Sequence, residues 1–275
     1  CDSLLFYRGM DIGTAKPTAE ERSRAPHHGI DLVPANKTFD VGSYLAYAER
    51  VVREVTERGN RILVVGGSGF YLQSFFAPVI DEVGIDPDLR TRVREWEDAE
   101  GSDGLLKRLH ELNPEGLGDL DADNPRRVAR ALERCLASGK GLLSLQLDFR
   151  NKDFPFRDFS KVTWVLDRDD ADLEDRVRHR ASSMLENGLL EEVKALRDEG
   201  LEENPSAARA VGYRETLLHL DGKYSRTEWQ EAVFVATMRL ARKQRKWFRS
   251  RLPTDRTILL SAGQTTVNSA APWEV

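Results

Sequence analysis

The 275-residue sequence lacks any apolar run near the roughly 18 residues that a membrane-spanning helix needs. It also has no stretch with the pattern of a secretory signal. Cysteine is scarce: Cys1 and Cys135 lie far apart and match no metal-binding spacing. These absences argue against a membrane protein and a disulfide-stabilised secreted domain. They predict a protein of the reducing cytoplasm with no membrane partner.

Two kinds of site are also missing. The five histidines form no ligand set, since His27 and His28 are adjacent and the others are scattered. A bound metal is therefore expected to be Mg²⁺, held by oxygen ligands and a substrate diphosphate. The phosphate-binding motif GxxxxGK followed by Ser or Thr is absent too. Its nearest approximation, Ser138-Gly139-Lys140-Gly141, ends a helical pattern instead of following a strand.

Charge is unevenly distributed along the chain. The net charge of −5 does not by itself indicate a nucleic-acid-binding protein. Residues 239–251 (RLARKQRKWFRSR) nevertheless hold seven basic residues and no acid, and RRVAR at 126–130 forms a second basic cluster. Because neighbouring cations without acids repel one another, the 239–251 segment predicts an external polyanion as its partner.

Hydrophobic patterns predict an α/β fold. Asp2-Ser3 has the pattern of a strand end, and residues 62–65 and 161–167 read as further strands. Short, unalternating strands between helical segments favour a parallel sheet covered on both faces. Helices are expected after the cap residues Thr18 and Asp40, and over residues 173–197 and 227–249.

The same patterns divide the chain into domains. Residues 1–81 and 141–260 form the predicted α/β core, 82–140 a helical insertion and 261–275 a tail. The insertion is strongly charged and contains no convincing strand. Within it, Asn124-Pro125 is a helix start and Gly139 the matching stop.

Three loops follow the predicted strands: Asp2-Ser3, Gly66-Gly67-Ser68-Gly69 and Asp167-Arg168-Asp169. In open α/β sheets that edge binds ligands. The glycine loop either presents backbone N–H groups to an anion or simply permits a sharp turn, and both interpretations stay open.

A pair of arginines follows the third loop. Arg176 and Arg180 are four residues apart on a predicted helix, so they share one face. They either hold a diphosphate or belong to a solvated face with partners such as Glu174.

Seven stretches resemble, in order, the tRNA dimethylallyltransferase (tRNA isopentenyltransferase) family. The resemblance implies transfer of a dimethylallyl group from dimethylallyl diphosphate to the exocyclic N6 of the adenosine 3′ of the anticodon. It also implies a cytoplasmic protein that is monomeric when full length and that binds Mg²⁺. Its fold would be a P-loop-NTPase-like α/β core with a helical insertion that grips the tRNA anticodon stem-loop. The stretches are DS…YRGMDIGTAKP (2–17), APHHGID (25–31), VVGGSGFYL (64–72), NPRRVARALE (124–133), DRVRHRASSMLENGLLEEVKAL (175–196), ARAVGYRE (208–215) and ATMRLARKQRKWFR (236–249).

The resemblance also implies roles for individual residues. Asp2 matches the catalytic base, which takes a proton from the amine of a flipped adenine. Arg176 and Arg180 match diphosphate-binding positions, while no residue is assigned as a certain Mg²⁺ ligand. The positions that match tRNA contacts are Asp2, Ser3, Leu4, Leu5, Ser68, Arg90, Arg126, Arg127, Arg130, Arg209, Gly212, Tyr213 and Arg214.

The sequence departs from the family pattern in three places. Leu5 stands where many members have Gln, and Lys246 stands where many have Thr. The family also begins with a strand and a Walker-type loop, roughly forty residues expected before Cys1, which would complete the Mg²⁺ site. A chain without them is expected to bind tRNA weakly and dimethylallyl diphosphate poorly, and whether it is catalytically active stays open. The alternatives are a non-catalytic tRNA-binding remnant and a small-molecule kinase of P-loop type.

Overall fold

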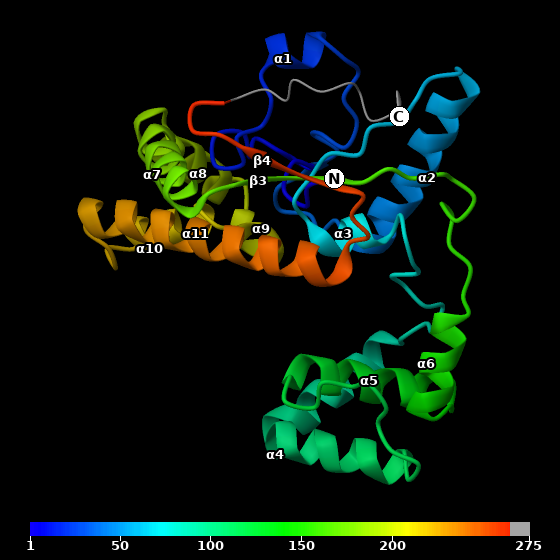
Figure 1. Cartoon of the computed structure of the whole chain (residues 1–275). Coiled ribbons are helices and arrows are strands. Elements are labelled where there is room, and N and C mark those ends of the chain that lie inside the picture. The colour runs from blue at the N-terminus through cyan, green and yellow to red at the C-terminus, as the bar shows by residue number, and fades with distance from the viewer. Residues whose placement is uncertain (265–275) are drawn as a thin grey trace. The chain divides into compact units, whose positions relative to one another are not determined.

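The computed structural model describes residues 1–264, which form two compact units (Figure 1). The larger unit comprises Cys1–Phe76 and the described residues from Pro155 onward, and the smaller unit is Ala77–Phe154. The smaller unit contains the predicted insertion of 82–140 but extends beyond it. The reason is helix α6 (Leu142–Arg150), whose Leu142 and Leu145 are buried in the core of that unit. Most of the predicted tail lies outside the described residues.

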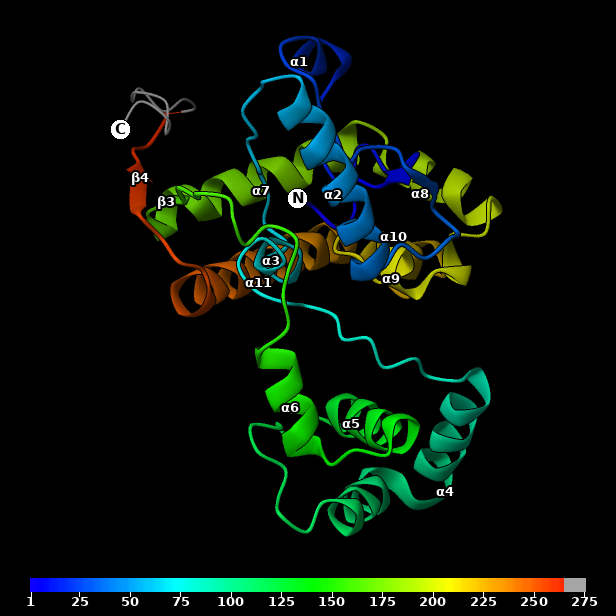
Figure 2. The ribbon, with the colours of Figure 1, turned by 90° about the vertical axis from the view of Figure 1, so that its right-hand side faces the viewer.

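Helices make up most of the larger unit. Its main core is formed where α7, α8, α10 and α11 pack together, around residues such as Val193, Tyr213 and Val233. Figures 1 and 2 both show α11 running alongside α7. The helices are α1 (Ala19–Ser23), α2 (Val41–Glu57), α3 (Gly69–Gln73), α7 (Asp170–Glu186), α8 (Leu189–Asp198), α9 (Pro205–Ala208), α10 (Tyr213–Leu220) and α11 (Arg226–Arg251), with a 3₁₀ turn at Leu201–Glu203.

The strands pair in parallel, as predicted, but the described residues form two small sheets instead of one. Strand β1 (Tyr7–Arg8) pairs with β2 (Val33–Pro34). Strand β3 (Trp164–Arg168) pairs with β4 (Arg256–Leu260), so that Trp164 lies opposite Arg256.

Two strand predictions are wrong. Asp2 and Ser3 do not end a strand, because the first strand begins only at Tyr7. Residues 62–65 are not a strand either, and Leu63 and Val65 are 65% and 68% exposed. A strand requires a neighbour for its backbone hydrogen bonds, and no strand within residues 1–264 pairs with this segment.

The predicted helix starts are confirmed, whereas one predicted helix is split. Thr18 forms a capping box with Glu21, and the Asp40 carboxylate accepts a hydrogen bond from the Ser43 N–H at 2.8 Å. The single helix expected over 173–197 is two, α7 and α8. Gly188 breaks it with a φ of 100°, a conformation that costs glycine little.

The smaller unit has its own core. Helices α4 (Pro87–Leu112) and α5 (Pro125–Ser138) pack together, and α6 packs against α5. Asn124 and Gly139 bound α5 as predicted. The buried side chain of Asn113 fastens this core, because it donates to the Leu109 carbonyl at 2.7 Å and accepts from the Leu142 N–H at 2.5 Å.

An aromatic cluster holds the first residues of the chain against α2 and α3. The Phe6 ring centroid lies 4.8 Å from that of Phe39 and 5.5 Å from that of Tyr44. The Tyr71 ring completes the cluster at 4.9 Å from Tyr44. Burial raises the pKa of Tyr71 to about 12 and raises the pKa of Tyr44 as well.

The raised pKa values of Tyr44 and Tyr71 predict that the free energy of unfolding falls above about pH 10, where tyrosines of the unfolded chain ionise and the folded chain keeps these two neutral. Tyr71 is partly exposed, so its share is expected to be at most about 1 kcal/mol at pH 11. Urea denaturation at pH 9 and pH 11 measures the effect. Tyr71→Phe is expected to lose less stability than the wild type over this interval, and an equal loss would contradict the prediction.

Candidate active site

The first residues of the chain run beside the glycine loop of residues 66–69. The Ser3 N–H donates to Ser68 Oγ at 3.0 Å, and the Ser68 hydroxyl donates to Ser3 Oγ at 3.2 Å. The Asp2 carboxylate accepts a hydrogen bond from the Leu4 N–H at 2.8 Å. Leu4 packs on the main core, and the Leu5 carbonyl accepts from the Asp31 N–H at 3.0 Å. The structure thus brings Asp2, Ser3 and Ser68 together.

The glycines of this loop permit close packing by three neighbours. A Cβ atom on Gly66 would collide with the Cys1 carbonyl, one on Gly67 with the Gln244 amide, and one on Gly69 with the Trp247 ring. The Gln244 side chain also donates to the Gly67 carbonyl at 3.1 Å. From the sequence, we considered an anion site and a sharp turn as explanations for these glycines. Close packing by neighbouring residues is a third explanation, which the sequence did not indicate.

Glu192 on α8 holds the loop of residues 9–17, which follows β1. Its carboxylate accepts hydrogen bonds from three consecutive backbone N–H groups, at 2.9 Å from Asp11, 2.6 Å from Ile12 and 3.2 Å from Gly13. The Tyr213 hydroxyl donates to the same carboxylate at 2.6 Å. Two distant motifs, DIGTAKP and GYR, therefore meet at one side chain.

Lys16 fixes the other end of the 9–17 loop. Its ammonium is buried and donates to the Tyr7 carbonyl at 2.9 Å, to Asp31 at 2.6 Å and also to Asp11. Arg22 pairs with Asp31 as well, at 3.1 Å. Burial alone would raise the pKa of Asp31, but Lys16 and Arg22 outweigh it and lower that pKa below its ordinary value. The Asp31 carboxylate thus stays ionised and keeps the loop attached.

Arg176 and Arg180 both lie on α7. The pKa of Arg180 is lowered by desolvation, while the negative charge of nearby Asp2 acts in the opposite direction. Arg180 also donates to the Thr14 carbonyl at 3.5 Å. Arg176 instead donates to Asp172 at 3.3 Å and to the Gln264 carbonyl at 3.5 Å.

Glu174, suggested as a partner of these two arginines, pairs instead with Arg178 at 3.5 Å. Both interpretations of the arginine pair stay open, because Arg180 is exposed and Arg176 has Asp172 as its ion-pair partner.

The 209–214 segment is divided between surface and core. Arg209 and Arg214 are exposed, whereas Gly212 is buried and the Tyr213 side chain is 0% exposed. The two arginines are therefore the predicted residues of this segment that can reach a ligand. The Gly212 N–H and the Arg214 Nε both donate to the buried Glu215 carboxylate, at 2.8 Å and 2.9 Å. Glu215 therefore orients Arg214.

A basic groove lies between α4 and α5 of the smaller unit. It has a volume of about 570 Å³ and is lined by Arg90, Arg94, Arg126 and Arg130 together with two glutamates. Arg130 pairs with the buried Glu133 at 3.3 Å. Arg94 was missed, although its spacing of four from Arg90 is a helical signal.

Arg127 was predicted beside these residues but does not line the groove, and it pairs with Asp121 at 3.2 Å.

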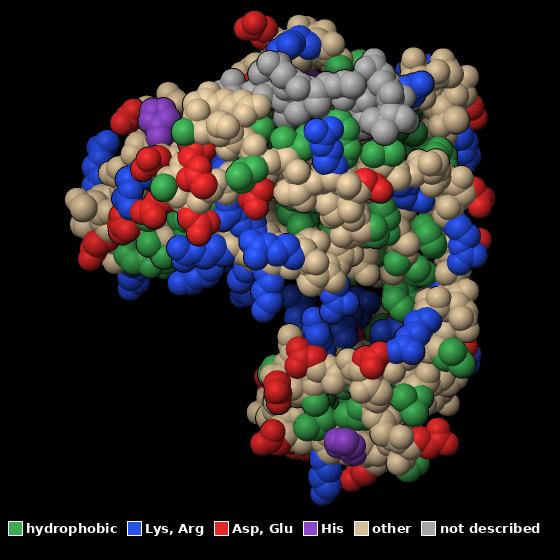
Figure 3. Space-filling model, viewed as in Figure 1, with side chains coloured by type: hydrophobic (Ala, Val, Ile, Leu, Met, Phe, Trp, Pro, Cys, Tyr) green, Lys and Arg blue, Asp and Glu red, His purple; other side chains and the backbone are tan. Residues whose placement is uncertain are grey.

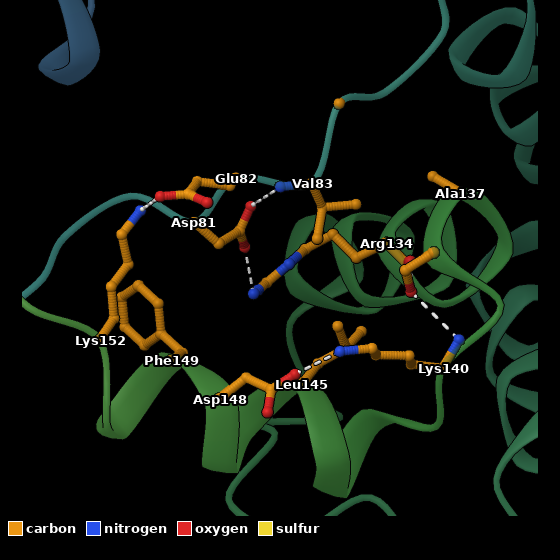
Figure 4. A pocket seen from close by; sticks show the side chains of 12 residues that line it. Asp81, Glu82, Val83, Arg134, Ala137, Lys140, Leu145, Asp148, Phe149 and Lys152 are labelled. Carbon is orange, nitrogen blue, oxygen red and sulfur yellow. Dashed lines mark hydrogen bonds and ion pairs between the residues drawn. The ribbon is translucent and has the colours of Figure 1, made fainter.

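A second cavity, of about 500 Å³, lies between the segment of residues 81–84 and helices α5 and α6 (Figure 4). Its cations are already neutralised, because Lys152 pairs with Glu82 at 3.1 Å and Lys140 with Asp148 at 2.7 Å. Arg134 forms the third ion pair, with Asp81. None of the predicted site residues lines this cavity.

The basic segment of residues 239–251, called the basic stripe below, forms an exposed surface on α11. Figure 3 shows Lys and Arg side chains gathered along this helix. One of its cations is turned inward, since Arg245 donates to Asp167 at 2.7 Å and also contacts Asp170. The exposed members of the stripe are Arg239, Arg242, Lys243, Lys246, Arg249 and Arg251.

Residues 1–264 contain neither a cluster of metal-ligating side chains nor a membrane-spanning helix. No group of three or more His, Cys, Asp or Glu side chains there could hold a metal ion. None of the helices described is both long enough and apolar enough to cross a membrane.

The comparisons with known proteins agree with one another. Residues 5–251 match the family model for IPP transferase. A tRNA dimethylallyltransferase from Opitutus terrae is 48% identical over 258 residues, covering 94% of this chain and 83% of that protein. The crystal structure of the full-length tRNA isopentenylpyrophosphate transferase from Bacillus halodurans has a TM-score of 0.66 at 29% identity, covering 96% of this chain and 81% of the other.

A third likeness concerns the fold alone. The structure of a eukaryotic dimethylallyltransferase acting on tRNA has a TM-score of 0.77 at 23% identity, covering 95% of this chain and 66% of the other. The predicted resemblance and the predicted enzyme class, a prenyltransferase, are confirmed. The chain belongs to the IPP transferase family.

Proposed function

We propose that this chain transfers a dimethylallyl group from dimethylallyl diphosphate to N6 of the adenosine on the 3′ side of the anticodon in tRNA. The observation that carries the proposal is the match of residues 5–251 to the IPP transferase family model, and the negative charge of Asp2, which acts on Arg180, adds to it. A proton acceptor and a cation in one place match what the reaction requires, because the amine must lose a proton while the diphosphate departs with negative charge.

In the proposed reaction, the adenine N6 attacks C1 of the dimethylallyl group. The C1–O bond breaks and its electron pair leaves with the diphosphate, while the N6 proton passes to the Asp2 carboxylate. Arg180, with Arg176, attracts the diphosphate through the planar fork of the guanidinium group. Mg²⁺ is proposed to bind together with the diphosphate, and no step is assigned to it.

The basic groove and the exposed cations of α11 are proposed to contact tRNA phosphates. Arg90 and Arg126 have no ion-pair partner within the described part of the chain, so their charges are available to an RNA backbone. Contacts of this kind supply affinity that falls with salt, because binding releases counterions from the RNA.

We therefore expect Arg90→Ala combined with Arg126→Ala to weaken tRNA binding. The slope of log affinity against log salt should fall by about one for each phosphate that is no longer neutralised. Fluorescence anisotropy between about 50 and 200 mM salt measures the slope. Arg53→Ala on α2 removes a charge that is also exposed and should leave the slope unchanged. An unaltered slope in the double variant would exclude the groove as an RNA-binding surface.

The decisive test incubates the chain with unmodified tRNA and radiolabelled dimethylallyl diphosphate. Label that enters the tRNA at the adenosine 3′ of the anticodon supports the proposal. Retention of tRNA without incorporation would indicate an RNA-binding remnant instead. ATP-dependent phosphorylation of a nucleoside would indicate a kinase.

A further inference from the structure

We propose that Glu192 is a positioning residue for the proposed prenyl transfer: its carboxylate fixes the 9–17 loop, whose Thr14 carbonyl accepts a hydrogen bond from Arg180. The inference rests on the proposed function for its catalytic meaning. Its structural part, the link from Glu192 through the loop to Arg180, can be tested separately. Glu192 carries no role among the predicted site residues.

The first step is the number of hydrogen bonds that one carboxylate accepts. Glu192 accepts four hydrogen bonds, three from consecutive backbone N–H groups and one from the Tyr213 phenol. Successive N–H groups pointing to one spot form a concavity that binds anions. Here the protein fills that concavity with its own carboxylate, which anchors the backbone of the loop at Asp11, Ile12 and Gly13.

The second step is the rigidity of the anchor. The Tyr213 ring is buried, and a Cβ atom added at Gly13 would lie 2.5 Å from it, so the ring and the loop are in close contact. Burial raises the pKa of Tyr213, and the charge of Glu192 raises it further. The phenol thus keeps its proton and remains a donor to Glu192 at neutral pH.

The third step connects the loop with the candidate active site. Between the two anchors, Glu192 and Lys16, lies Thr14, whose carbonyl accepts a hydrogen bond from Arg180 at 3.5 Å. Ala15 follows with a φ of 49°, which a non-glycine residue adopts only when its surroundings hold it there. Releasing the Glu192 anchor therefore frees the segment that contacts Arg180, and with it the diphosphate-binding charge.

The experiment uses Glu192→Gln in the full chain. The amide keeps one oxygen as acceptor but turns N–H groups toward donors, so the four hydrogen bonds cannot all form. We expect kcat/KM for dimethylallyl diphosphate to fall about tenfold to a hundredfold, mainly through KM, with tRNA affinity unchanged. Tyr213→Phe, which keeps the three backbone bonds, should have a much smaller effect. Glu191→Gln, an exposed neighbour on α8, is the matched control.

A readout that needs no activity separates this inference from the proposed function. The guanidinium nitrogen resonance of Arg180 should move in Glu192→Gln and stay in place in Glu191→Gln. If Glu192→Gln lowers only Tm, while the Arg180 resonance and the donor KM keep their wild-type values, Glu192 is merely structural and the proposal is overturned. If the wild type transfers no label, the proposed function fails, and the Arg180 resonance alone decides the positioning role.

Discussion

Asp2→Asn is expected to lower the rate of dimethylallyl transfer by about 10²–10⁴-fold, because an amide cannot take the proton that leaves the adenine amine. The substitution preserves shape: the asparagine oxygen can still accept the hydrogen bond that the Leu4 N–H now donates to Asp2. Folding and tRNA affinity should therefore change little. Single-turnover incorporation of labelled donor into tRNA measures the chemical step.

The control for this prediction is Asp198→Asn, an exposed carboxylate at the end of α8. It changes the net charge by the same amount and should leave the rate unchanged. A rate for Asp2→Asn within about threefold of the wild type would remove Asp2 from the role of general base.

Gly13→Ala is expected to destabilise the fold by about 1–3 kcal/mol, since the new methyl group would overlap the buried Tyr213 ring. Neither partner can move freely, because the ring is enclosed by the core and the Gly13 N–H is bound to Glu192. Urea denaturation measures the loss. Gly84→Ala is the control, as a Cβ atom at Gly84 meets nothing within 4 Å.

A double-mutant cycle tests the stated cause. In a Tyr213→Ala background the overlap is gone, so Gly13→Ala should cost much less than it does alone. If the cost is the same in both backgrounds, the destabilisation has a source other than the Tyr213 ring.

Local signals in the sequence predicted helix boundaries well. The Thr18 and Asp40 caps, the Asn124-Pro125 start and the Gly139 stop all appear in the structure. Each depends on a few neighbouring residues, so the sequence contains everything needed to read it. The apolar run of residues 62–65 failed as a strand prediction because a strand depends on a distant neighbour.

In the candidate site, too, some residues could be identified from the sequence and others only from the structure. The resemblance pointed to Asp2, Ser3 and Ser68, and the structure brings these residues together. It assigned no role to Lys16 or to Glu192, and the backbone partners of Glu192 lie on a distant part of the chain. A glutamate in an amphipathic helix looks like a solvated residue until the backbone N–H groups that it binds, about 180 residues away, are known.

The enclosure of Lys16 has a chemical consequence. Its side chain is 1% exposed and its ammonium is surrounded by oxygen acceptors, so acylating reagents cannot reach the amine while the loop is closed. Modification of this lysine requires the surrounding segment to detach. The rate at which Lys16 is acylated, compared with that of the exposed lysines of the same molecule, therefore measures how often the 9–17 loop opens.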